Sequence, residues 1–113
     1  MAQVTKSFIG DIVDFVEQMD QAILEGSASA SLEAAEETMI GACRVFVRVY
    51  ERYSYAGGNR LSLSVTVAGD GFSNWVSATT SGGSQALFFK VNTWGEETFM
   101  EKFEEFFYQY TKS

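Results

Sequence analysis

The sequence contains no histidine and no proline, and it has one cysteine among 113 residues. Without histidine, the chain cannot use a Ser-His-Asp triad, a Cys-His pair or a His-ligated zinc site. The lone Cys43 excludes an internal disulfide and a cysteine-based metal cage, which is typical of a reducing compartment. These absences exclude most common hydrolase mechanisms, and they predict a cytoplasmic protein that is not an enzyme and carries no cofactor.

Basic residues are also scarce, because 8 lysines and arginines stand against 15 aspartates and glutamates and leave a net charge of −7. Affinity for nucleic acid depends on lysine and arginine side chains that neutralise phosphates. The sequence has no apolar run of about 20 residues, and Asp11 and Asp14 interrupt the N-terminal stretch, which does not resemble a secretory signal. We therefore expect contact with neither nucleic acid nor membrane.

Apolar and aromatic residues are abundant, at 46% and 15% of the chain. Domains commonly have about 100 to 150 residues, and a chain of this size can bury a core without disulfides or metal. No low-complexity run or internal repeat marks a boundary. Residues 1–113 are therefore predicted to form a single domain.

The N-terminal part predicts a strand followed by a helix. Side-chain character partly alternates over residues 3–9, which favours an edge strand. From Asp11 to Leu24, apolar residues recur at steps of three and four, as in an amphipathic helix. Asp11 and Asp14 suit the positive end of the helix dipole, and Gly26, which tolerates positive φ, follows the helix.

Residues 27–42 fit more than one pattern. Alternation favours a strand from about 28 to 33, a turn, and a second short strand near 38 to 41. Strong helix formers also leave a helix over residues 31–38 open.

The rest of the chain predicts a meander and a closing helix. Ser81-Gly82-Gly83-Ser84 is interpreted as a hairpin connection rather than a phosphate loop, because it lacks the Lys-Ser/Thr that follows such a loop. Thr93 and Glu96 have the spacing of a capping box, so a helix is expected to begin there, with a stripe of aromatic residues on one side and an acidic outer side. The predicted strands cover Cys43–Tyr55, Arg60–Ala68, Trp75–Thr80 and Gln85–Val91.

This order of elements predicts a two-layer α+β fold, in which an antiparallel meander sheet carries the N-terminal and C-terminal helices on one face. The order also resembles a small helix-grip arrangement, the kind used by lipid- and steroid-binding proteins. Such a resemblance is one of architecture, and fold alone does not assign function.

Four strings of residues resemble a closer family, which consists of short bacterial proteins and is known as a domain of unknown function. The resemblance covers most of the chain and implies a bacterial cytosolic protein. It brings no activity, ligand or catalytic residue with it. The strings are Tyr50–Ser54, Gly57–Arg60, Ser81–Ala86 and Asn92–Glu97.

The most specific feature is a row of arginines on one predicted strand. Arg44, Arg48 and Arg52 are four residues apart and share a strand face, with Phe46 and Tyr50 between them. If the helices cover one sheet face, this row is expected on the other. Three interpretations stay open: a solvated face whose arginines pair with acids, a protein interface, and a site for a small anion.

We therefore predict a non-enzymatic interaction module that forms a homodimer or binds another protein, with Arg44, Arg48, Tyr50 and Arg52 at the contact. The alternative is a small-molecule binding protein with a pocket between Phe103 of the last helix and the sheet. Cys43 is expected to be a buried small hydrophobe, and Trp75 and Trp94 are expected to fill the core. The carboxylates of the last helix are expected in solvent, with no metal.

Overall fold

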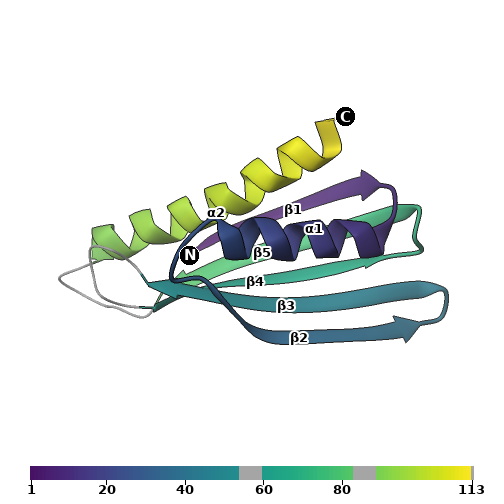
Figure 1. The fold of residues 1–113 in the computed structure, drawn as a ribbon, viewed down its shortest axis with the longest axis horizontal. Coiled ribbons are helices and arrows are strands. Elements are labelled where there is room, and N and C mark those ends of the chain that lie inside the picture. Colours follow the sequence, from purple (N-terminus) through teal and green to yellow (C-terminus); the bar gives the residue numbers. More distant parts are fainter. Residues whose placement is uncertain (54–59, 83–88, 113) are drawn as a thin grey trace.

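The computed structural model describes residues 1–53, 60–82 and 89–112, and for residues 89–96 it describes the backbone alone. Figure 1 shows both helices over one sheet, so the predicted two-layer α+β architecture is confirmed. No helix in the described ranges has an apolar stretch long enough to cross a membrane. The elements are β1 (Ala2–Ile9), α1 (Ile12–Glu25), β2 (Ser31–Ile40), β3 (Cys43–Tyr53), β4 (Arg60–Gly69), β5 (Ser73–Gly82) and α2 (Phe89–Lys112).

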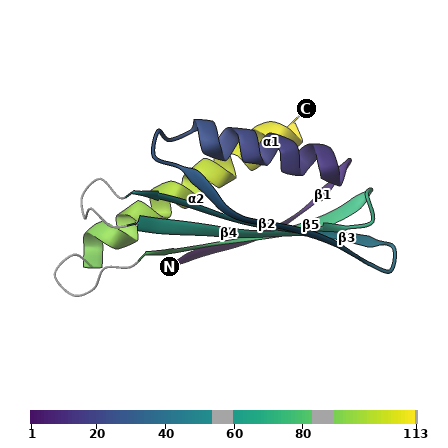
Figure 2. The same cartoon turned by 60° about the horizontal axis from the view of Figure 1, so that its bottom comes forward.

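The five strands form one antiparallel sheet in the order β1-β5-β4-β3-β2. β2 to β5 follow one another as a meander, and β1 pairs with β5 at the far edge. The helix α1 carries the chain across the sheet from β1 to β2, which puts the two edge strands next to each other in sequence. Figure 2 shows both helices on one side of the sheet and no described element on the other. Among the described elements, the helices therefore cover the same single face of the sheet.

The helix α1 forms where the sequence predicts it. The Asp11 carboxylate caps its start by accepting hydrogen bonds from the backbone N–H groups of Val13, at 2.9 Å, and Asp14, at 3.2 Å. Gly26 at its end has a φ of −77°, so the helix does not use the glycine's tolerance for positive φ. The residues of the predicted apolar stripe are buried: Ile12, Phe15, Val16, Met19 and Ile23.

The prediction for residues 27–42 is correct for strand over 31–33 and 38–40 but wrong between them, because β2 is one strand that pairs with β3 along its length. Neither the predicted turn nor the helix over 31–38 is present. The register shifts between Leu32 and Ala34, where a bulge interrupts the alternation that would identify one long strand. β2 lies at the sheet edge, and nearly all of its residues are exposed. The strand therefore does not show the alternation of apolar and polar residues that marks a half-buried strand.

The start of α2 also differs from the prediction. The helix begins at Phe89, so Thr93 and Glu96 lie inside it and do not mark its start. The predicted strand Gln85–Val91 is wrong over residues 89–91, and its residues 85–88 lie outside the described part. A short apolar run such as Leu87–Phe89 fits a buried strand and a buried helix equally well, and only the tertiary structure decides between them.

Aromatic rings join the two helices to the edge of the sheet. Phe15 of α1 is fully buried and stacks on Phe8 of β1, with ring centroids 4.0 Å apart. Its ring also meets Tyr110 at 5.1 Å, Phe106 at 5.2 Å and Phe107 at 6.0 Å, all from α2. These distances are typical of favourable aromatic pairs. The predicted aromatic stripe of the last helix is thus confirmed as part of the core.

Candidate functional site

The two faces of the sheet are unlike, and β3 shows the difference. Its side chains alternate as predicted, with Phe46 and Tyr50 on one face and Val45, Val47 and Val49 on the other. The prediction that the arginine-bearing face lies away from the helices is wrong, because Phe46 and Tyr50 are buried in the core. Burial of the two aromatic rings determines which face of β3 packs against the helices. The arginines fit on this face because their aliphatic parts can pack on apolar side chains while the charged guanidinium groups reach a partner.

Two of the predicted site residues, Arg48 and Tyr50, meet Asp20 of α1. The Tyr50 hydroxyl donates a hydrogen bond of 2.5 Å to Asp20 Oδ1. Arg48 Nε donates to both carboxylate oxygens of Asp20, at 3.1 and 3.2 Å. Tyr50 is fully buried, while the side chains of Arg48 and Asp20 are 15% and 23% exposed. The cluster therefore attaches α1 to the middle of β3.

Burial raises the pKa of Tyr50 far above its ordinary value, and the hydrogen bond to Asp20 raises it further. The hydroxyl consequently stays protonated and donates to the carboxylate across the physiological pH range. A protonated, fully buried hydroxyl cannot act as a base or nucleophile toward a molecule in solvent. The arrangement serves to hold the helix on the sheet.

The Tyr50 hydroxyl should make stability sensitive to alkaline pH. Since folding raises the pKa of Tyr50 above its unfolded value of 10.0, its contribution is complete below that pH and is lost as the pH rises. We expect the free energy of unfolding, measured by urea denaturation, to fall less steeply above about pH 10 in Tyr50→Phe than in the natural chain. Identical slopes in Tyr50→Phe and the natural chain would contradict the assignment.

Arg44 and Arg52, the other predicted contact arginines, have different partners. Arg44 forms an ion pair of 3.2 Å with Glu37 of β2, at a site where both side chains are well exposed. The guanidinium of Arg52 lies 4.5 Å from the ring centroid of Phe99 of α2. Together with Arg48 on Asp20, the three arginines line the covered face and contact three different elements. An anion that bridged them would have to displace these contacts.

Phe103, predicted to line a ligand pocket, is fully buried in the core. Its ring centroid lies 6.3 Å from that of Phe107 and 6.5 Å from that of Phe106. The side chain is thus part of the packed aromatic cluster between α2 and the sheet. Its structural role is clear from these contacts, whereas its role in ligand binding stays a prediction.

The other side of the sheet has a different composition. We call this side, opposite α1 and α2, the uncovered face. The half-buried valines of β3 form one stripe on it, and small hydroxyl side chains fill most of the part made by β4, β5 and β1. One pair of these hydroxyls, Ser62 and Ser81, is hydrogen-bonded at 2.6 Å. The hydroxyl residues are Thr5, Ser7, Ser62, Ser64, Thr66, Ser73, Ser77, Thr79 and Ser81.

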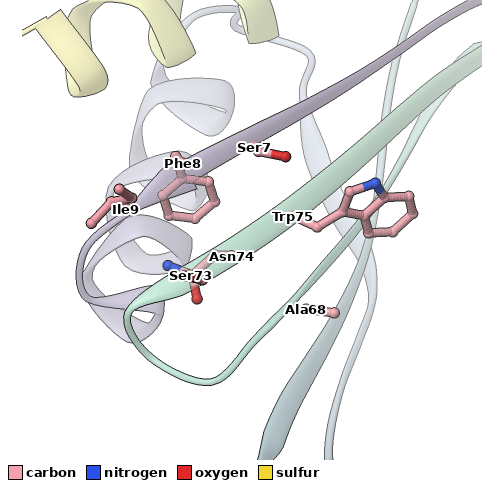
Figure 3. A pocket seen from close by; sticks show the side chains of 7 residues that line it. All are labelled: Ser7, Phe8, Ile9, Ala68, Ser73, Asn74 and Trp75. Atoms are coloured by element: carbon pink, nitrogen blue, oxygen red, sulfur yellow. The ribbon is translucent and has the colours of Figure 1, made fainter.

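A shallow hollow of about 490 Å³ lies at one end of the uncovered face. Figure 3 shows Trp75 and Ile9 at opposite sides of it, with the small side chain of Ser7 between them. Trp75 is 43% exposed and Ile9 is 70% exposed. The prediction that Trp75 fills the core is therefore wrong; the corresponding prediction for the Trp94 side chain lies outside the described residues. An exposed tryptophan beside small residues is the type of feature that anchors protein contacts.

Most charges of the uncovered face lie at the end opposite this hollow, and Glu36 of β2 lies apart from them beside Val47. Arg60 Nε forms an ion pair of 2.7 Å with Glu51, and its Nη2 lies 3.5 Å from Glu33. The same guanidinium lies 5.0 Å from the ring centroid of Tyr53. Arg60 therefore offsets one of the three carboxylates on this face, Glu33, Glu36 and Glu51. Each exposed pair contributes little to stability.

In the ranges that the structure describes, no three His, Cys, Asp or Glu side chains are grouped so that they could hold a metal ion. Cys43 is exposed, so the prediction of a buried small hydrophobe is wrong. It lies at the start of β3, where the sheet extends beyond the helices.

Sequence reasoning missed Asp20 and misplaced Trp75. Asp20 follows Val16 by four residues and precedes Ile23 by three, which places its carboxylate on the buried stripe of α1. That position was a signal of a buried partner. Trp75 lies between Asn74 and Val76, which are buried, so the alternation of β5 places the indole on the opposite face. The prediction gave more weight to the usual burial of tryptophan than to this alternation.

Three comparisons with known proteins bear on this chain. A family model described as a family of unknown function (DUF6054) matches residues 1–111. Neither the curated proteins nor the solved structures contain a significant match to the chain. The resemblance to a family of unknown function is confirmed, and function has to be argued from the structure.

Proposed function

We propose that this chain, which belongs to the DUF6054 family of unknown function, is a non-enzymatic interaction module that binds a protein partner through the uncovered face. The observation that carries the proposal is the one-sided packing of the sheet, with α1 and α2 on one face and the other left open. A sheet normally buries at least one face against another layer, and a second open face is available for a further layer.

The composition of the uncovered face supports binding rather than simple solvation. Val45, Val47 and Val49 of β3 are half-buried on it, and Trp75 is exposed on β5, on the other side of β4. A solvated sheet face is typically rich in charged side chains. Contact surfaces, by comparison, have fewer charged residues at their centre and more aromatic residues. Here most of the charges lie at one end, Glu36 lies on the edge strand β2, and small hydroxyl groups fill the centre.

The described chemistry supports a non-enzymatic role. The chain has no histidine, and its most perturbed group, Tyr50, is buried with its hydroxyl bonded to Asp20. Catalytic acids and bases need a pKa near the working pH and access to substrate, and Tyr50 has neither. The exposed thiol of Cys43 supports a reducing compartment such as the cytoplasm, and the resemblance to short bacterial proteins supports a bacterial one.

Photocrosslinking tests this proposal at a single site. Ser64 is exposed on β4, the central strand, where it is paired with Val49 on one side and Thr79 on the other. A photoreactive phenylalanine analogue at position 64, in cells of the natural source, should give discrete adducts on irradiation. The same analogue at position 18, in place of the exposed Gln18 on α1, is the matched control and should give few or none.

A second substitution makes the result specific to the face. Thr66 lies one pleat along β4 on the same side as Ser64, so Thr66→Arg should abolish the adducts from position 64 by adding an unpaired charge to the contact. Adducts from position 18 alone, or no adducts from position 64 in a chain that folds normally by circular dichroism, would overturn the proposal.

A further inference from the structure

We infer that the partner of the uncovered face is a second copy of this chain, packed face to face so that two sheets form a sandwich with the helices outside. This inference rests on the proposed function and specifies its partner. Three properties of the face support a second copy: its area, its charge and the pattern of its side chains.

The area of the face matches what a stable interface needs. Five strands about 4.8 Å apart, each of about ten residues at about 3.3 Å per residue, span roughly 800 Å². A protein interface of standard size buries about 800 Å² on each partner. A second sheet laid over this one would therefore bury a standard interface without any rearrangement of the helices.

The charge distribution favours a second copy over a partner of opposite charge. The helix α1 and residues 97–112 of α2 carry eight carboxylates against two lysines, so a basic partner would be drawn to the helix layer. Two copies with a net charge of −7 each repel one another least when these layers point apart. Face-to-face packing achieves this, because the uncovered face carries a net charge of −2, less than the −6 that the eight carboxylates and two lysines give the helix layer. Its charged residues are Glu33, Glu36, Glu51 and Arg60.

The pattern of side chains suits a two-fold axis that runs along β4. In the register of the sheet, Trp75 of β5 and Val45 of β3 flank the same residue of β4, Ala68. Rotation about an axis along β4 exchanges the two sides, so that Trp75 of one copy meets Val45 of the other, twice in each dimer. The bulky indole then lies against the valine stripe, while small side chains on β4 allow the two sheets to approach to about 10 Å.

Static light scattering across a range of concentrations tests the inference. The natural chain should have a mass of about 25 kDa, twice the 12.5 kDa of one chain. Ser64→Arg, and separately Ser77→Arg, should give the monomer mass, because both add a long cation near the axis. Trp75→Ala should raise the dimer Kd by about 30-fold or more, as loss of an aromatic anchor does. Gln18→Arg makes the same charge change on the helix layer and should leave the dimer intact.

Two results would overturn the inference. A mass of one chain at every concentration would exclude a second copy; adducts from position 64 to another protein would then leave the proposed function standing. A dimer that persists in Ser64→Arg and Ser77→Arg, with both variants folded by circular dichroism, would place the contact at an edge strand or on the helices instead.

Discussion

Phe15→Ala should lower the free energy of unfolding by about 4 kcal/mol, because truncation of a buried phenylalanine costs about 3 to 5 kcal/mol. The ring is fully buried and meets Phe8 of β1 on one side and three rings of α2 on the other. Its loss leaves a cavity where β1, α1 and α2 meet. No neighbouring element can close this cavity without giving up its own ring contacts.

Chemical denaturation in urea measures this effect directly. Phe72→Ala is the matched control, since Phe72 is 65% exposed in the turn between β4 and β5, and we expect it to change stability by less than about 0.5 kcal/mol. A loss of stability in Phe15→Ala as small as that of the control would show that the aromatic cluster does not hold the two layers together.

Asp20→Ala should lower the free energy of unfolding by about 3 kcal/mol, the lower end of the cost of breaking a buried ion pair. The substitution removes the acceptor of both the Tyr50 hydroxyl and Arg48 Nε. Tyr50 is fully buried, so water cannot readily replace the lost carboxylate. The remaining guanidinium of Arg48 also loses its counter-charge in a site that is only 15% exposed.

Two other variants separate the effect of the hydrogen bond from that of the ion pair, and provide a control on the same helix. Tyr50→Phe removes one hydrogen bond but leaves the ion pair, so we expect a loss of about 1 kcal/mol. Glu17→Ala removes an exposed carboxylate from the same helix and should have little effect. If Asp20→Ala proved no more destabilising than Glu17→Ala, the cluster would not be what holds α1 on β3.

Local patterns predicted the elements whose signal does not depend on the rest of the fold. The helix α1 has a capping aspartate and a regular apolar stripe, and β4 alternates buried and less buried residues along its length. β1 and α2 were predictable for similar reasons, although the start of α2 was not. There, an apolar run suits strand and helix alike, so the local pattern does not decide between them.

The strand β2 shows why other parts could not be predicted. Its bulge between Leu32 and Ala34 breaks the period of two, and its position at the edge leaves it almost entirely exposed. Both features depend on the pairing partner β3, which a local pattern does not contain. The same limit applies to the site: alternation identified the two faces of β3, but which face the helices cover depends on the whole core.

The arginine row illustrates this limit at single residues. A sequence in which Arg44, Arg48 and Arg52 share a face suggests an exposed basic surface, yet the intervening Phe46 and Tyr50 are buried. The carboxylate of Asp20, which is distant in sequence, accepts hydrogen bonds from Arg48 and Tyr50. The uncovered face became apparent only once the helices were placed.

The distance between two spin labels tests most directly whether copies of the chain meet through the uncovered face. In a Cys43→Ser background, nitroxides attached at Gln3→Cys or Gln18→Cys can be measured by pulsed dipolar electron paramagnetic resonance. Gln3 is exposed on the edge strand β1 and pairs with Thr79 on the uncovered face, so a label there lies at the rim of the contact. With sheets about 10 Å apart and strands about 4.8 Å apart, a two-fold axis along β4 should place the two labels at position 3 about 20 Å apart. The labels at position 18 should be farther apart, because both helix layers separate them. Absence of dipolar coupling at position 3, or a shorter distance at position 18, would contradict the account.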